Sequence, residues 1–163
     1  MKLLGGFLIA AAGVWSGFLA AGKLSASAAR CGSWCRMLEL LSFELVRFLT
    51  PLPELFASLA ERLDGAAGET CGSVAEDLRT GLGFRAAWRS ATENVPREER
   101  ELLLPLGDVL GRFGAEEQAA CADAVRERMN GLWKSRRREL GRRSRVCVGV
   151  GSALGLMLAV LLM

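Results

Sequence analysis

Residues 38–60 read LELLSFELVRFLTPLPELFASLA and hold two apolar stripes on either side of a helix boundary. Large apolar side chains recur every three or four residues before the boundary, which predicts an amphipathic helix over about residues 29–49. At the boundary, Thr50 is a residue type that favours the N-cap, and Pro51 favours the first helical position. The apolar positions beyond the boundary predict a second helix that ends near Gly65.

The helical period continues toward the C-terminus, and no stretch of the central sequence alternates as a half-buried strand would. Residues 65–73 are rich in Gly and Ala, and we expect them to include a turn. Further helices are expected over about residues 70–80 and 84–93, from Pro96 onward with a kink at Pro105, and from 114–116 onward. The sequence therefore predicts an all-α fold, an antiparallel bundle of about six helices.

An apolar run precedes this bundle. Residues 3–21 contain no charged side chain and lie between Lys2 and Lys23. As a helix they would reach roughly 28 Å, which matches the hydrocarbon thickness of a bilayer. We therefore expect an N-terminal transmembrane helix.

A second apolar run, residues 146–163, follows a basic collar formed by residues 134–145. The cations of the collar are Lys134, Arg136, Arg137, Arg138, Arg142, Arg143 and Arg145. Arginines clustered just before an apolar helix are the positive-inside signature, and each cation near anionic headgroups contributes on the order of 1 kcal/mol. We expect a C-terminal transmembrane helix whose collar lies at the membrane interface on the cytoplasmic side.

Between the two runs, residues 24–133 form a domain with 12 arginines and 17 Asp or Glu residues. An acidic domain argues against a nucleic-acid-binding protein. Lys23, Arg30 and Arg36 follow the first run, so both flanks place this domain in the cytoplasm.

One alternative is an exported protein that keeps only its C-terminal anchor. Residues 26–28, Ala-Ser-Ala, form an A-x-A site of the kind that signal peptidases cleave, and the mature chain would then begin at Ala29. Cleavage would place the collar on the wrong side of the membrane, so the two-helix anchor is favoured. A membrane-permeabilising protein is a third alternative, which the folded acidic centre disfavours.

The sequence offers no recognisable catalytic chemistry. It contains no histidine, no Walker A motif and no serine with a base at readable spacing. Its five cysteines include the i,i+4 pair Cys31 and Cys35 but no CxxC, so we expect reduced thiols and no zinc site. Glu98, Glu99 and Glu101 are interpreted as a solvated helix start. We predict a non-enzymatic protein without a cofactor or a metal.

Several stretches together resemble the stage III sporulation protein AB family of endospore-forming bacteria. They are residues 38–60, LLLPLGDVLGRFGAEEQ at 102–118, the opening MKLLGGFLIAAAGVWSGF, and the basic collar with its apolar tail. The most specific elements are Glu44 with TPLPE at 50–54, the doubled Leu-Gly at 106–107 and 110–111, and the following Gln118. Gly114 departs from the acidic residue that the family usually has there.

The resemblance implies a membrane-anchored scaffold or platform of the channel between mother cell and forespore, needed for endospore formation and located in the mother-cell septal or engulfing membrane. It is similar to the cytoplasmic domains of the type II secretion inner-membrane platform protein. Implied partners are other stage III sporulation proteins, including a cytoplasmic secretion-type ATPase, and the scaffold could form a homo-oligomer. The candidate partner-binding residues are Glu44, Thr50, Pro51, Glu54, Gly107, Gly111 and Gln118. Turn chemistry and close helix packing are the alternative roles of these residues.

Overall fold

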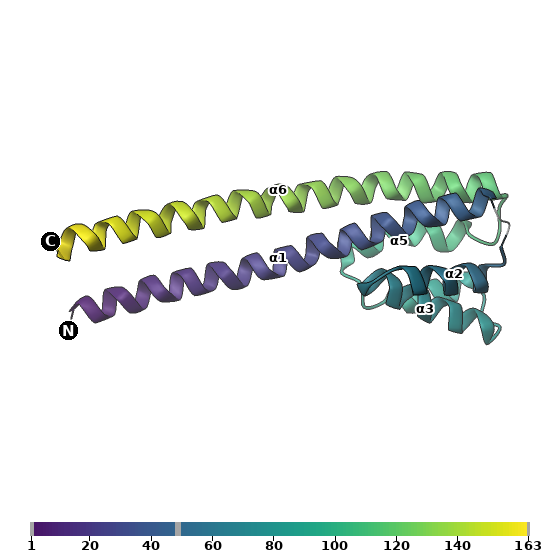
Figure 1. The fold of residues 1–163 in the computed structure, drawn as a ribbon. Helices are drawn as coiled ribbons and strands as arrows, with labels where there is room; N and C mark the ends of the chain where they lie inside the picture. The colour runs from purple at the N-terminus through teal and green to yellow at the C-terminus, as the bar shows by residue number, and fades with distance from the viewer. Residues whose placement is uncertain (1, 48–49, 163) are drawn as a thin grey trace. The chain divides into compact units, whose positions relative to one another are not determined.

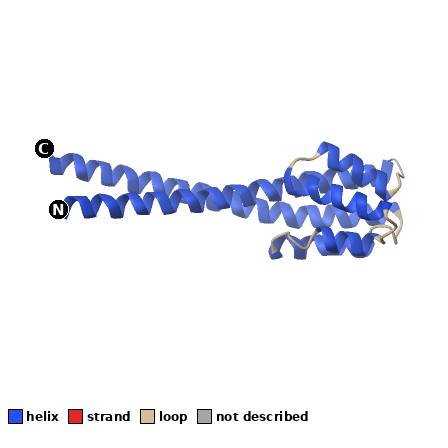
Figure 2. Cartoon of the chain, turned by 90° about the horizontal axis from the view of Figure 1, so that it is seen from below, coloured by secondary structure: helices blue, strands red, loops and turns tan. Residues whose placement is uncertain are grey.

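A computed structural model describes the backbone of residues 2–47 and 50–162, and the side chains of residues 22, 25–47 and 50–142. All regular structure in these residues is helical (Figure 1). Figure 2 shows helices joined by short loops. The helices are α1 (Lys2–Arg47), α2 (Leu52–Arg62), α3 (Gly65–Arg79), α4 (Phe84–Ala91), α5 (Arg97–Val109) and α6 (Ala115–Leu162). The prediction of an all-α fold with about six helices is confirmed.

The chain divides into two compact units. A central unit holds residues 29–133, and a flanking unit holds residues 1–28 and 134–163. The predicted membrane spans, residues 3–21 and 146–163, have a helical backbone as far as Leu162, but their side chains lie outside the described residues. Among the side chains that are described, no helix has both the length and the apolar character needed to cross a membrane.

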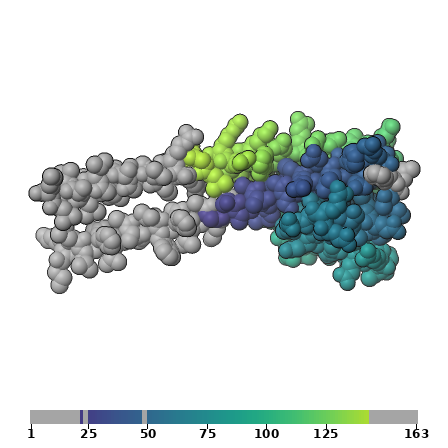
Figure 3. Space-filling view, in the orientation of Figure 1, coloured from purple at the N-terminus to yellow at the C-terminus, as the bar shows by residue number. Residues whose placement is uncertain are grey.

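The core of the central unit is one cluster to which all six helices contribute. Trp34, Met37 and Leu41 of α1 are fully buried, as the helical period of residues 29–49 predicts. Phe56 and Trp88 meet at a ring-centroid distance of 6.0 Å. On the face drawn in Figure 3, the side chains of α1 and of α2–α3 lie against one another.

The start of α2 differs slightly from its prediction. Pro51, and not Thr50, occupies the N-cap position, and its carbonyl accepts hydrogen bonds from the amides of Glu54 and Leu55, both at 3.0 Å. No side chain caps this helix. The fixed φ of proline suits the helix entry, so Pro51 sets the boundary without a hydroxyl cap.

The turn predicted within residues 65–73 is confined to Gly65, because α3 begins there and not near residue 70. Gly65 has φ +69°, a left-handed conformation that glycine adopts without strain and that reverses the chain after α2. At Gly68 a Cβ atom would collide with the carbonyl oxygen of Leu63. Gly65 therefore makes the turn into α3, and the absence of a side chain at Gly68 allows α3 to start tightly against the end of α2.

Candidate functional site

A groove of about 980 Å³ opens on the central unit where the start of α2, helix α4 and the end of α5 meet. Its apolar lining consists of Leu52, Pro53, Leu78, Phe84, Ala86 and Leu110. Three arginines, Arg85, Arg89 and Arg112, also line it, together with Gly83, Gly107 and Gly111. Two of the seven predicted partner-binding residues, Gly107 and Gly111, therefore belong to one concave surface.

Gly107 shapes one wall of the groove. A Cβ atom at this position would lie 2.9 Å from Cδ1 of Trp88, so only glycine allows α5 to approach α4 this closely. The indole Nε1 of Trp88 donates a hydrogen bond of 2.9 Å to the carbonyl oxygen of Leu103, which fixes the ring beneath α5. Gly107 thus has a packing role whether or not a partner binds there.

Gly111 lies beyond the end of α5, which stops at Val109, so Gly107 and Gly111 do not share one helix. Gly111 has φ +78°, and a Cβ there would lie 3.0 Å from Cδ1 of Leu52. Its amide donates to Oε1 of Gln118 at 3.3 Å, and Nε2 of Gln118 donates to the carbonyl of Phe113 at 2.6 Å. Gln118 therefore holds the turn between α5 and α6.

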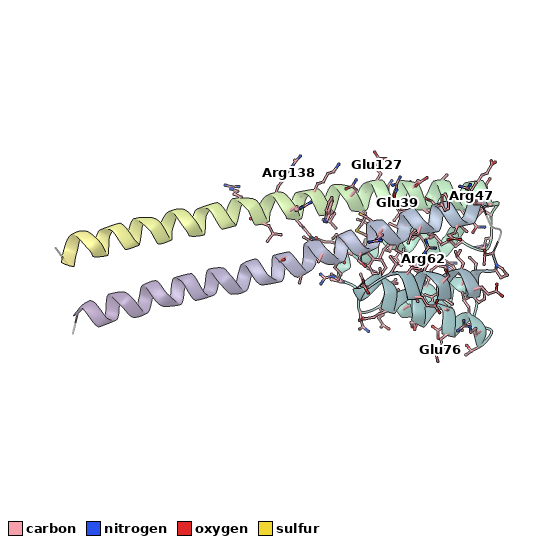
Figure 4. The ribbon with its side chains drawn as sticks, viewed as in Figure 1. Glu39, Arg47, Arg62, Glu76, Glu127 and Arg138 are labelled. Atoms are coloured by element: carbon pink, nitrogen blue, oxygen red, sulfur yellow. The ribbon has the colours of Figure 1, made fainter. Side chains whose placement is uncertain are left out.

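The other predicted partner-binding residues lie at the connection between α1 and α2. Oε1 of Glu44 accepts a hydrogen bond from Nη1 of Arg62 at 2.7 Å, which ties the two helices together. Figure 4 labels Arg62 where α2 faces α1. Thr50 is half-buried, whereas Pro51 and Glu54 are exposed. Glu54 is thus the charged member of this group that faces solvent.

The predicted collar is described only in part. Lys134, Arg137, Arg138 and Arg142 are exposed, and Arg136 is half-buried. Figure 4 shows Arg138 projecting outward from α6. Arg143 and Arg145 have side chains outside the described residues.

Among the side chains that the structure describes, the most buried charged residue is one whose environment the sequence predicts wrongly. Glu99 is fully buried, so the prediction of a solvated helix start is wrong at this position, although Glu98 and Glu101 are exposed. Nε and Nη2 of Arg30 donate to the Glu99 carboxylate at 3.2 and 3.3 Å, and the indole Nε1 of Trp34 donates to it at 3.2 Å. Arg30, which was counted with the cytoplasmic flank, therefore joins α1 to α5.

A signal for this burial exists in the sequence. Glu99, Leu103 and Leu106 follow one another at helical spacing, so the carboxylate lies on the apolar stripe of α5. A charged residue on such a stripe needs a buried partner.

The described thiols are poorly suited to chemistry. Cys35, Cys71 and Cys121 are free thiols. Burial raises the pKa of the Cys71 thiol to about 12, and burial also raises the pKa of Cys35 and Cys121. Because the thiolate is the nucleophile and the metal ligand, these groups are weak in both roles at neutral pH. No cluster of three or more metal-ligating side chains occurs within the described ranges.

Two comparisons with known proteins find a match. The family model for Stage III sporulation protein AB matches residues 2–163. A solved structure of Stage III sporulation protein AB (SpoIIIAB) is similar with a TM-score of 0.62 and 17% sequence identity, over 69% of this chain and 94% of that one. At this identity the structural similarity shows a shared fold. Among curated protein sequences, none matches.

Proposed function

Because the chain belongs to the stage III sporulation protein AB family, which gives it a role in sporulation, we propose that it is a non-enzymatic scaffold of a secretion-like channel between mother cell and forespore. In this proposal two membrane helices, residues 3–21 and 146–163, hold the central unit at the cytoplasmic face of the mother-cell membrane. Its partners are other proteins of the stage III assembly, including a cytoplasmic secretion-type ATPase. The match of the family model over residues 2–163 carries the proposal.

The charge distribution supports the orientation. The acidic central domain is separated from the last apolar run by the collar, whose cations prefer the cytoplasmic side. The exposed collar side chains Lys134, Arg138 and Arg142 lie where anionic headgroups can reach them.

The state of the polar groups supports a role without catalysis. The Glu99 carboxylate is held by Arg30 and Trp34, and the thiol of Cys71 is buried and protonated at neutral pH. What the central unit offers to solvent is a shaped surface with a groove, which suits the binding of other proteins.

The exported form is the competing proposal. It requires cleavage after residues 26–28, but α1 continues through this site without interruption from Lys2 to Arg47. Intact mass spectrometry of the membrane-bound protein distinguishes the two forms, since cleavage would leave a chain that starts at Ala29.

The location of the central unit is tested by thiol labelling in protoplasts. Cys71 is unsuitable as a reporter because it is fully buried. A variant without native cysteines and with Ser73→Cys, an exposed position on α3, provides a better one. We expect a membrane-impermeant maleimide to label it only after permeabilisation. Labelling of intact protoplasts would place the unit outside and overturn the proposal.

The role in the assembly is tested in an endospore-forming host. Deletion of the gene should abolish heat-resistant spores, and the full chain should restore them and co-purify with the stage III proteins. A chain without residues 3–21 should do neither. Normal sporulation of the deletion strain would contradict the proposal.

A further inference from the structure

We propose that the groove between α2, α4 and the end of α5 binds an acidic, amphipathic segment of a cytoplasmic partner protein. The proposal rests on the scaffold function above and names the surface through which the scaffold acts. It combines three observations: the charge of the groove, its apolar lining and its fixed shape.

The charge of the groove is opposite to that of the domain around it. Arg85, Arg89 and Arg112 line the groove, and none of the described residues that line it is acidic. The domain as a whole carries 17 acidic residues against 12 arginines. Like charges repel, so this surface attracts an acidic segment and disfavours a basic one.

The three arginines are available to a ligand. Arg85 pairs with Asp108 at 2.8 Å, but both side chains are 53% exposed, so the pair exchanges readily. Within the described part of the chain, the side chains of Arg89 and Arg112 form no ion pair and no hydrogen bond, and both are exposed. A carboxylate that enters the groove therefore breaks few of the interactions that stabilise the fold.

The apolar lining provides the contact area for the other face of an amphipathic segment. Leu52 and Pro53 are only half-buried, and they face a cavity that is lined also by Phe84 and Leu110. Leu82 and Phe113, the chain neighbours of the lining residues Gly83 and Arg112, are also exposed. An apolar centre with a charged rim is the usual anatomy of a protein-binding patch.

The shape of the groove is fixed before binding. Trp88 lies in contact range of Gly107, and Gln118 holds the turn at Gly111 through two hydrogen bonds. A preformed surface loses little conformational entropy when a ligand binds, so even a short segment is held.

Titration with a synthetic helical peptide tests whether the groove binds an acidic, amphipathic segment. The probe has leucines at i, i+3, i+4 and i+7 and glutamates elsewhere, and it carries a fluorophore for anisotropy measurements. It is titrated with the full chain in nonionic detergent micelles. We expect binding that weakens with salt and that R89E/R112E reduces by at least about tenfold. A peptide with lysine in place of glutamate should not bind.

Two control variants isolate the groove. R79E/R128E makes the same change in charge outside the groove, and Arg79 occupies the last turn of α3 as Arg89 does in α4. R137Q/R138Q weakens the collar, which could also attract the peptide. Both should bind like the wild type. Loss of binding in either control, with binding retained in R89E/R112E, would overturn the proposal. If tryptophan fluorescence shows R89E/R112E to be unfolded, R89Q/R112Q replaces it, with about threefold or greater weakening expected.

The failure of this inference differs from the failure of the proposed function. If R89E/R112E loses the peptide but still co-purifies with the stage III proteins and forms heat-resistant spores, the scaffold function stands and the groove is not its partner surface. If sedimentation shows that the wild type self-associates and that R89E/R112E does not, a second copy of the chain occupies the groove, which also overturns the proposal.

Discussion

Two ion pairs in the central unit use the same chemistry in opposite surroundings. Arg30 and Glu99 join α1 to α5 at 3.2 Å, with the Glu99 side chain fully buried and Arg30 30% exposed. Arg85 and Asp108 join α4 to α5 at the shorter distance of 2.8 Å, but on the surface beside the groove. Burial, and not distance, decides which pair stays formed. A buried carboxylate that loses its partners keeps an unpaired charge in the protein interior, whereas an exposed carboxylate is solvated by water. The Arg30–Glu99 pair is therefore a fixed part of the fold, whereas the Arg85–Asp108 pair beside the groove can exchange partners.

Removal of the buried carboxylate tests the permanent pair. Glu99→Ala leaves the guanidinium of Arg30 and the indole N–H of Trp34 without their acceptor. We expect the free energy of unfolding of the full chain in micelles to fall by about 3 kcal/mol, near the lower limit for a buried pair because Arg30 is partly exposed. Denaturant titration followed by tryptophan fluorescence measures it. Glu98→Ala, next to it and exposed, should cost less than about 0.5 kcal/mol. Equal losses in both variants would mean that burial does not separate the two pairs.

Substitution of Gly107, in the wall of the groove, should cost nearly as much stability as substitution of the buried pair. Gly107→Ala places a methyl group against Trp88 at 2.9 Å, and we expect a loss of about 1–3 kcal/mol from overpacking. Gly131→Ala is the matched control, because Gly131 lies within α6 and a Cβ there meets nothing within 4 Å. That control should gain about 0.5–1 kcal/mol from helix propensity. The two variants should shift the unfolding midpoint in opposite directions, and a shared direction would refute the packing role of Gly107.

Substitution of Gln118, which holds the turn at the end of the groove, should lower the free energy of unfolding by an intermediate amount. Gln118→Ala removes the acceptor of the Gly111 amide and the donor to the Phe113 carbonyl. Both backbone groups are near solvent, so we expect a loss of about 1 kcal/mol. Gln118→Glu keeps the acceptor and should retain part of this stability. If Gln118→Ala leaves the midpoint unchanged, Gln118 is free to act in partner binding alone.

Substitutions in the exposed pair, Arg85 and Asp108, should change the free energy of unfolding least. Arg85→Ala and Asp108→Ala should each change the free energy of unfolding by less than about 0.5 kcal/mol, and the double variant should show no appreciable coupling. A coupling energy above about 1 kcal/mol in this double-mutant cycle would show that the pair is structural and does not exchange with a ligand.

Local sequence signals predict much of the fold. The apolar stripe of α1 and the prolines at 51 and 96 predict where α2 and α5 begin, because these signals act within one or two turns of the chain. The start of α3 differs from its prediction because a run of Gly and Ala residues favours a turn in the sequence, whereas here it forms the first turns of a helix. The carbonyl of Leu63 lies only five residues before Gly68, and it fits beside α3 because Gly68 has no side chain.

The candidate site was predicted only in fragments. Gly107 and Gly111 were identified by motif, but the arginines beside them come from α4 and the α5–α6 turn, which only the fold brings together. The burial of Glu99 was missed for a related reason. Its partners, Arg30 and Trp34, lie more than 60 residues earlier in the chain, and composition alone favours solvent for a glutamate.

The core cluster that α1 shares with α6 has a further consequence, because the ribosome makes α6 last. The apolar face of α1 ends at Leu45, and the last members of the same cluster, Val125 and Met129 of α6, lie roughly 80 residues later in the chain. At 5–20 residues per second, synthesis leaves that face uncovered for ~4–16 s. Contacts this distant in sequence also close slowly. Nascent chains should therefore depend on chaperones that shield apolar helices until α6 has been made.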